Sequence, residues 1–201
     1  MGVREAQKLA TRRRVLDAAS DLFNEIGFED ATVRAIANRA GVSVGSVFTT
    51  FTSKADILNQ VMLDRLERLY EETGRVIPLM RGGTADRVRS LFAVLYAFET
   101  RRVKLFLAHI AVAYRWDMEP TARPFGANQV FRTLMSEWLA DGVARGDLRP
   151  DVDIPAVVDV LLGLYAWNYR LAASEGADAD RLTALMDQQV GMVFDGLRPR
   201  G

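Results

Sequence analysis

The chain of 201 residues has no cysteine and one histidine, and this scarcity limits the chemistry it can perform. Without cysteine there is no disulfide and no thiolate ligand for a metal. One histidine with no cysteine partner gives little basis for metal catalysis or for Cys–His nucleophilic chemistry. A glycine-rich phosphate-binding loop is missing as well. We therefore expect a protein that is not an enzyme and that holds no metal and no cofactor.

Long hydrophobic runs are also missing from the sequence. No run approaches the roughly 18 apolar residues that a membrane-spanning helix needs, so we expect no membrane partner. The N-terminal stretch MGVREAQKLATRRR lacks the apolar core of a secretory signal, and we expect a cytoplasmic protein. Apolar residues make up 49% of the chain and charged residues 26%, which is typical of a globular protein.

Neither sign of charge is in excess, with 26 basic and 26 acidic residues, but their distribution is uneven. Residues 1–14 carry five basic residues and one acidic residue, and residues 1–54 carry eight basic and six acidic. This modest positive footprint suits a small nucleic-acid contact from each of two subunits better than a surface that coats the nucleic acid.

Alternation of polar and apolar residues, the pattern of strands, is almost absent, and helical spacing dominates. We predict an all-α fold of about nine helices, two of which lie within residues 32–51. A loop with two prolines is predicted at 117–124. The other predicted helices span residues 11–26, 54–78, 85–100, 103–116, 125–145, 156–174 and 181–197.

The segment 32–58 has the pattern of two short helices joined by a glycine turn and followed by the start of a third. Thr32 is placed to cap the first helix and Ser43 the second, because each hydroxyl can accept from a free backbone amide. Gly41 takes the left-handed turn between them without strain. We expect the second helix to pack inward through Val47, Phe48 and Phe51. Such a pair is the helix-turn-helix unit, whose second helix enters the major groove of DNA.

Three motifs follow one another in this part of the chain. An arginine-rich helix ending in glycine reads TRRRVLDAASDLFNEIGF (11–28), and residues 32–43 read T-x-x-x-I-A-x-x-A-G-V-S. Residues 45–58 are similar to G-[ST]-[LIV]-Y-x-[HY]-F-x-[SN]-K-x-x-[IL]. Together these motifs resemble the DNA-binding domain of TetR-family transcriptional regulators. The resemblance implies a helix-turn-helix DNA-binding domain at 1–54 and a helical domain for effector binding and dimerisation at 55–201.

The same resemblance implies which residues contact DNA. Serine hydroxyls at the start of the second helix can bond to bases or phosphates, Val44 can pack on a thymine methyl group, and Gly45 allows close backbone approach. Lys54 is a phosphate anchor by its charge, and Arg12 to Arg14 can reach the backbone or the minor groove. The alternative for Thr32 and Ser43 is that they only cap their helices. The predicted DNA-binding residues are Arg12, Thr32, Ser43, Val44, Gly45, Ser46, Phe48, Thr49, Thr50 and Lys54.

The segment departs from the family pattern at two positions of the second helix and its end. The family pattern has tyrosine, an aromatic residue that carries a hydroxyl group, where this chain has Phe48. It has histidine or tyrosine where this chain has Thr50. Val44 stands where many relatives carry a basic or polar residue. We therefore expect fewer charged contacts, weaker nonspecific affinity, and more reliance on DNA shape and methyl contacts.

In the family, helices five to seven enclose a small molecule. The corresponding region here is rich in aromatic residues and methionine with few polar groups, which suits a largely apolar ligand held by one or two hydrogen bonds. The alternative is that these residues form ordinary core. The predicted ligand-binding residues are Phe92, Tyr96, Phe106, His109, Phe131, Met135, Trp138 and Trp167.

The last two helices form the dimer interface in the family, and the sequence agrees in part. Residues 156–174 are apolar on nearly all faces, and a helix of this kind needs cover on every side. Residues 181–197 carry an apolar stripe, so two helices from each of two subunits would make a four-helix interface. The alternative is a monomeric core pair. The predicted interface residues are Val157, Val160, Leu161, Leu164, Leu182, Leu185, Met186 and Val193.

Together these features predict a homodimeric, sequence-specific regulator that binds a palindromic double-stranded DNA operator. By family habit it would be a repressor released by a small, largely apolar effector. The alternative function is a DNA-binding or protein-interaction module without a small-molecule effector.

Overall fold

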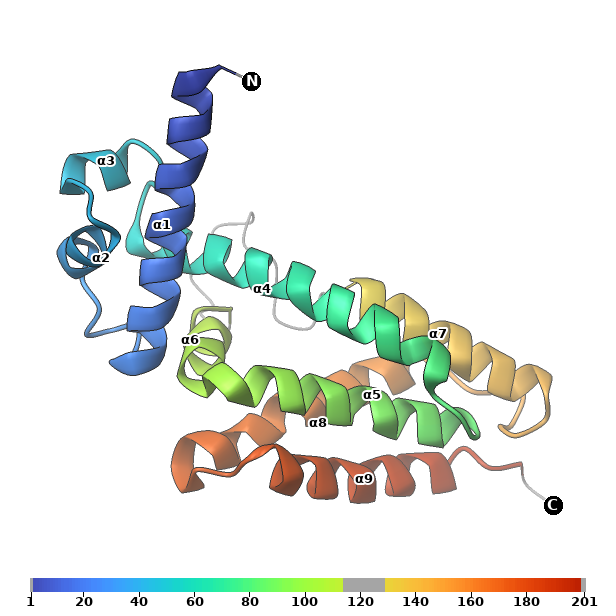
Figure 1. Cartoon of the computed structure of the whole chain (residues 1–201). Coiled ribbons are helices and arrows are strands. Elements are labelled where there is room, and N and C mark those ends of the chain that lie inside the picture. Colours follow the sequence, from blue (N-terminus) through green and yellow to red (C-terminus); the bar gives the residue numbers. More distant parts are fainter. Residues whose placement is uncertain (1, 114–128, 200–201) are drawn as a thin grey trace. The chain divides into compact units, whose positions relative to one another are not determined.

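The computed structural model describes residues 2–113 and 129–199, and every regular element within these ranges is a helix (Figure 1). This confirms the prediction of an all-α chain. No helix in the described ranges has the length and apolar character needed to cross a membrane. The α-helices are α1 (Val3–Glu25), α2 (Val33–Ala40), α3 (Val44–Phe48), α4 (Lys54–Val76), α5 (Thr84–Glu99), α6 (Val103–Ala113), α7 (Gln129–Ala144), α8 (Ile154–Glu175) and α9 (Ala179–Asp195).

The helix ends lie close to the predicted ones, with two informative differences. Helix α1 begins at Val3 and not at residue 11, because residues 3–10 contain no glycine or proline and Glu5 favours the positive end of the helix dipole. Helix α8 begins at Ile154, where Asp153 accepts from the backbone N–H of Ala156 at 3.1 Å. The predicted loop at 117–124 and the predicted helix ends at 116 and 125 lie outside the described residues.

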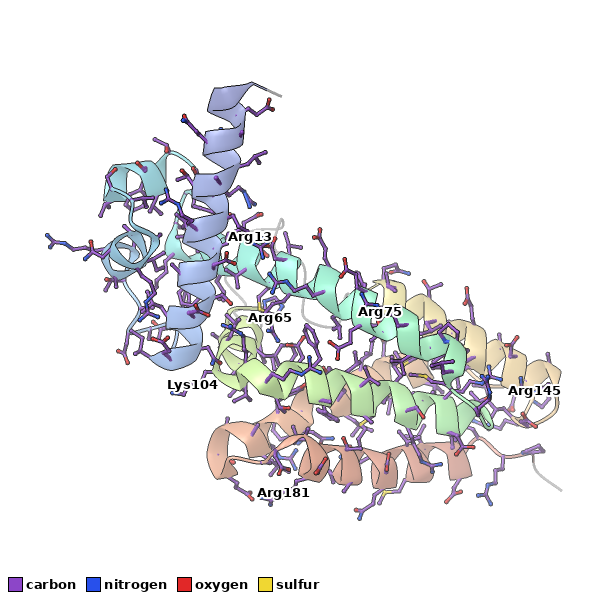
Figure 2. All side chains as sticks on the ribbon, viewed as in Figure 1. Arg13, Arg65, Arg75, Lys104, Arg145 and Arg181 are labelled. Atoms are coloured by element: carbon purple, nitrogen blue, oxygen red, sulfur yellow. The ribbon has the colours of Figure 1, made fainter. Side chains whose placement is uncertain are left out.

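The chain folds as two compact units. Among the described residues, the first contains 2–70 and 102–113, and the second contains 71–101 and 129–199. In the first unit α6 packs on α1, where Lys104 donates to the carbonyl oxygen of Glu25 at 3.0 Å (Figure 2). Arg13 of α1 pairs with Asp64 of α4 at 3.2 Å. The predicted boundary between a DNA-binding and an effector domain at 54/55 stays a prediction. By packing, α6 and most of α4 belong with the N-terminal helices.

In the second unit α5 packs along α9, while α7 and α8 complete the layer around a shared core. At Gly142, α7 comes close to α5, because a Cβ atom there would lie 2.6 Å from the Thr84 hydroxyl of α5. A polar network crosses the core. The Tyr96 hydroxyl donates to the carbonyl oxygen of Tyr165 at 3.2 Å, and Asn168 donates to Gln189 at 2.7 Å. These bonds satisfy groups that would otherwise be costly to bury.

Candidate DNA-binding site and effector half

The helix-turn-helix segment forms as its caps predict. Thr32 Oγ1 accepts from the backbone N–H of Ala35 at 3.1 Å at the start of α2. Gly41 has φ +65°, the left-handed conformation that glycine adopts without strain, and it ends the same helix. Ser43 Oγ accepts from the N–H of Ser46 at 3.0 Å and begins α3. The sequence therefore fixes where both helices of the pair start and where the first one ends.

The inward face of α3 consists of Val47, with Phe51 one turn further along the chain. Both are almost fully buried. The prediction that Phe48 also packs inward is wrong, because its side chain is 54% exposed. Successive residues of a helix are rotated by about 100°, so the residue that follows buried Val47 is turned away from the core.

The outward face of α3 is apolar. Phe48 lies four residues after Val44, which is 37% exposed, so the two side chains share one face. Gly45 is exposed between them, and a Cβ atom there would meet nothing closer than Ser43 Oγ at 3.8 Å. Nothing in the chain itself requires glycine at this position, and the missing side chain leaves room for an external surface to approach the helix.

The hydroxyl groups at the two ends of α3 have hydrogen-bond partners within the chain. Ser43 and Ser46 share a hydrogen bond of 2.8 Å between their side chains, and the Thr49 hydroxyl donates to the carbonyl oxygen of Ser46 at 2.7 Å. The capping alternative for Thr32 and Ser43 is therefore realised in the structure, and their contact with DNA stays a prediction. Thr50 is half-buried at the end of the segment.

Two of the predicted phosphate anchors are occupied within the chain. The Lys54 ammonium donates to the carbonyl oxygens of Phe28 at 2.7 Å and Glu29 at 3.0 Å, and it lies over the Phe28 ring at 4.4 Å. Arg12 donates to the Gln60 side chain and stacks over Phe51 at 5.5 Å. These bonds tie α4 to α1 or to the segment that follows α1, and only one ammonium proton of Lys54 remains free for a phosphate.

Arg14 and Arg34 are the better placed cations. Both are exposed, and neither side chain has an ion pair or hydrogen bond with another residue in the described part of the chain. Other arginines of α1 and α2 are held in ion pairs: Arg13 pairs with Asp17 and Asp64, and Arg39 pairs with Glu25. Arg34 was missed by the sequence analysis, although its position on α2, away from buried Ile36 and Ala37, identifies an outward side chain.

The predicted ligand-binding residues do not all lie in one unit. Phe106 and His109 belong to the first unit, and burial lowers the pKa of His109 to about 4. The other six belong to the second unit. Trp167 is 64% exposed there, which does not fit a place in an enclosed cavity, because it stands on the face of α8 that its own core does not cover. The remaining five are buried, namely Phe92, Tyr96, Phe131, Met135 and Trp138.

A pocket of ≈ 270 Å³ lies between α7 and α8 in the second unit. Polar residues one turn apart on α7 form most of its wall, and Arg132 pairs with Asp159 of α8 beside it. None of the predicted ligand-binding residues lines this pocket. The α7 residues of this wall are spaced three and four residues apart, so the sequence already placed them on one face of a helix. Among the described residues the lining is Gln129, Arg132, Thr133, Ser136, Glu137, Pro155 and Val158.

The predicted dimer residues divide into two groups. Three of them are fully buried within the chain itself, because α8 and α9 each turn one face toward their own core, and these cannot contact a partner: Leu161, Leu182 and Met186. The other five are half-buried or exposed, namely Val157, Val160, Leu164, Leu185 and Val193. Two strongly exposed apolar residues were not predicted at this face, Trp167 on α8 and Met192 on α9.

The capped α2–turn–α3 pair, with an uncovered face on its second helix, defines a helix-turn-helix DNA-binding protein. The family model described as "Bacterial regulatory proteins, tetR family" matches residues 15–61. The chain is a helix-turn-helix transcriptional regulator of the TetR family, a class of DNA-binding proteins and not of enzymes.

Relatives along the whole chain agree with this assignment. The HTH-type transcriptional repressor KstR2 of Rhodococcus jostii is 28% identical over 201 residues, covering 94% of this chain and 92% of the relative. The structure of Thermus thermophilus FadR, a TetR-family repressor in complex with lauroyl-CoA, is 27% identical with a TM-score of 0.68, over 94% of this chain and 96% of that one. The ketosteroid transcriptional regulator KstR2 of Mycobacterium tuberculosis shares the fold, with 23% identity, a TM-score of 0.65, and 94% and 95% coverage.

Replacing Lys54 by alanine separates its two roles. Loss of two charge-assisted hydrogen bonds is expected to lower the stability of the first unit by about 1–3 kcal/mol, visible as a lower Tm in a thermal melt. A residue that served DNA alone would leave Tm unchanged and would reduce the salt dependence of binding. Arg34→Ala is the matched control, since it is expected to weaken DNA binding at constant Tm.

Replacing Gly45 by alanine is expected to weaken DNA binding without harming the fold. The added methyl group meets no atom of the chain closely, and alanine favours a helix over glycine by up to about 1 kcal/mol. On the DNA side it blocks close approach, and we expect roughly a tenfold loss of affinity, the scale of one base contact. Thermal melting and fluorescence anisotropy measure the two effects. Unchanged affinity would mean that α3 does not approach DNA at Gly45.

Proposed function

We propose that the chain is a homodimeric repressor that binds a palindromic operator and leaves it when a small, largely apolar ligand binds the second unit. The single observation that carries the dimer is the set of large apolar side chains that α8 and α9 leave exposed. Trp167 and Val160 are exposed on α8, and Met192 is 72% exposed on α9. Exposed apolar patches of this kind mark association surfaces.

The dimer face differs from the one expected from the sequence. It excludes the three residues that the chain buries in its own core and gains Trp167 and Met192. Leu164 and Leu185 are half-buried at its edge, and a second copy would complete their burial. A two-fold axis through such a self-complementary face makes each subunit present one α3. Two recognition helices then read half-sites about 34–36 Å apart, or a multiple of that distance, which is why the operator is palindromic.

Two relatives support an effector with a large apolar part, an acyl chain in one case and a steroid skeleton in the other. The Thermus thermophilus FadR structure contains lauroyl-CoA, and the Mycobacterium tuberculosis relative is named a ketosteroid regulator. The buried residues predicted to bind ligand have the matching character. Phe92, Tyr96 and Met135 offer apolar surface, and the Tyr96 hydroxyl and Asn168 supply the few polar groups.

The ligand can act only through unequal affinity for the two states of the dimer. To move a population from mostly DNA-competent to mostly released, it has to bind the released state about 10⁴-fold more tightly. The α7–α8 pocket and the aromatic core are both within the second unit, so a ligand at either place would act on the packing of α5, α7 and α8.

One observation favours the alternative of a regulator without an effector. The aromatic residues of the second unit are in direct contact, with Tyr96 and Tyr165 ring centroids 4.9 Å apart and Phe92 and Tyr165 5.4 Å apart. A ligand at this place has to displace these rings, whereas a module without an effector would keep them packed. Ligand screening decides between the two.

Capture of fragmented genomic DNA by the purified protein at physiological salt, followed by sequencing, tests the DNA-binding part of the proposal. We expect enrichment of a short palindrome. Retention without a shared motif, lost as salt rises, would contradict sequence-specific binding.

Thermal shift and operator release in the presence of lauroyl-CoA test the effector part, with choline as a contrasting small cation. We expect the acyl thioester to raise Tm and to release the operator, because a ligand that binds the folded state stabilises it. Release by choline alone would contradict an apolar effector, and release by no small molecule in a wider screen would favour the alternative.

A further inference from the structure

We propose that α3 reads the C5-methyl groups of thymines in the major groove, with Val44 and Phe48 as the reading side chains. This inference rests on the proposed function, because it assigns the chemistry by which the operator is recognised.

The face that α3 offers is apolar where recognition helices usually carry polar side chains. Val44 and Phe48 are one helical turn apart and both exposed, and Gly45 between them adds no side chain that would hold DNA away. Val44 and Phe48 together give α3 an exposed apolar surface, and a partner with an apolar group can cover it.

The polar groups of α3 leave little for direct hydrogen-bond readout. Ser43 and Ser46 bond to each other, and Thr49 bonds to the helix backbone. Moreover, residues 43–52 contain no Arg, Lys, Asn, Gln, Asp or Glu. The charged and amide side chains that make the usual specific pairs with guanine, adenine or cytosine are therefore absent from the segment.

Among the four bases, thymine alone presents an apolar group to the major groove. Its C5-methyl group fits the chemistry of valine and of an aromatic ring. The positions of Val44 and Phe48 also set a spacing. Four residues of helix rise about 6 Å, and base pairs are stacked about 3.4 Å apart. The two side chains therefore reach thymines within about two base-pair steps of each other in each half-site.

Two cations on the helices that precede α3 suit contacts with the phosphate backbone. Arg14 on α1 and Arg34 on α2 are exposed and unpaired in the described part of the chain. They suit phosphate contacts, which position the protein but carry no sequence information. Apolar contacts from α3 then supply the sequence preference.

The test uses the full chain and the operator recovered from genomic capture. Each thymine is replaced in turn by deoxyuridine, which lacks only the methyl group, and affinity is measured by fluorescence anisotropy. We expect about a fourfold loss for each methyl group that is read, the worth of one buried carbon group. Where a cytosine replaces such a thymine, 5-methylcytosine is expected to bind more tightly than cytosine, because it restores the methyl group at the same place.

Variants assign the methyl contacts to the two side chains. Phe48→Ala and Val44→Ala are each expected to abolish the difference between thymine and uracil at one position while leaving Tm unchanged, since both side chains are exposed. Leu63→Ala, at an exposed apolar residue of α4, is the matched control and is expected to keep every difference. When one variant binds too weakly for the comparison, the other provides it.

The outcomes separate this inference from the function on which it rests. Tight operator binding with equal affinity for thymine and uracil at every position would overturn methyl readout and leave the regulator intact. Persistence of every thymine preference in both variants would overturn the assignment to Val44 and Phe48. Failure to recover any shared operator would overturn the proposed function itself.

Discussion

Replacing Trp167 by glutamate is expected to convert the dimer into monomers and to lower operator affinity by roughly 10²–10⁴-fold, the usual gain from linking two binding modules. Trp167 is the largest exposed apolar side chain on α8. In a dimer it would be covered by the partner, and a carboxylate there would have to lose its hydration at the interface, a cost that Arg170, which lies 5.0 Å from the Trp167 ring, would offset only in part. Each monomer would keep its fold and one α3, but it would bind a half-site alone.

Sedimentation equilibrium measures the subunit state, and anisotropy with full and half operators measures the affinity. Leu79→Glu is the matched control, because Leu79 is equally exposed but lies in the 3₁₀ turn Ile77–Leu79, away from α8 and α9 in sequence. We expect this control to stay dimeric. A Trp167→Glu protein that remains dimeric at the same concentration would place the subunit contact elsewhere.

Acidification from pH 7 to pH 5 is expected to cost the first unit about 2 kcal/mol of stability through His109 alone. Burial lowers the pKa of His109 to about 4 in the folded state, compared with 6.5 for an exposed imidazole. Well above pH 6.5 the imidazole is neutral in both states and the stability is complete. As the pH falls toward 4, the unfolded chain takes up a proton that the folded chain excludes, so stability is lost; below about pH 4 the loss is complete.

Urea denaturation at pH 7 and pH 5 measures this effect as a shift of the midpoint. His109→Gln is the comparison variant, because glutamine has a similar size, suits a helix, and does not titrate. Carboxylates contribute equally to both proteins, so the difference between their pH slopes isolates His109. Equal slopes would mean that His109 is accessible to protons in the folded state.

Local sequence signals predicted the helix-turn-helix pair well, because they act over a few residues. The Thr32 and Ser43 caps and the left-handed Gly41 each depend on neighbours within one turn, and the structure forms all three as expected. The outward position of Phe48 was open to prediction as well, since it follows from the rotation between adjacent residues. It was missed because an aromatic residue was assumed to belong to the core.

Partners distant in the sequence could not be predicted in this way. Lys54 bonds to carbonyls 25 and 26 residues earlier, and nothing around Lys54 marks it as a clamp and not as a phosphate anchor. The dimer face shows the same limit. Helix α8 is apolar on nearly all sides, so periodicity alone could not tell buried Leu161 from exposed Trp167 until its packing against the core was known.

The placement of α6 has a consequence for the order in which the protein is made. Lys104 bonds to Glu25 across 79 residues, so α1 waits for α6 before this side of the first unit is complete. Translation at about 5–20 residues per second imposes a delay of about 4–16 seconds between the two helices. During that interval the nascent chain holds its N-terminal helices without their last partner. A regulator cannot occupy an operator as a completed unit until its ribosome has passed well beyond the segment that touches DNA.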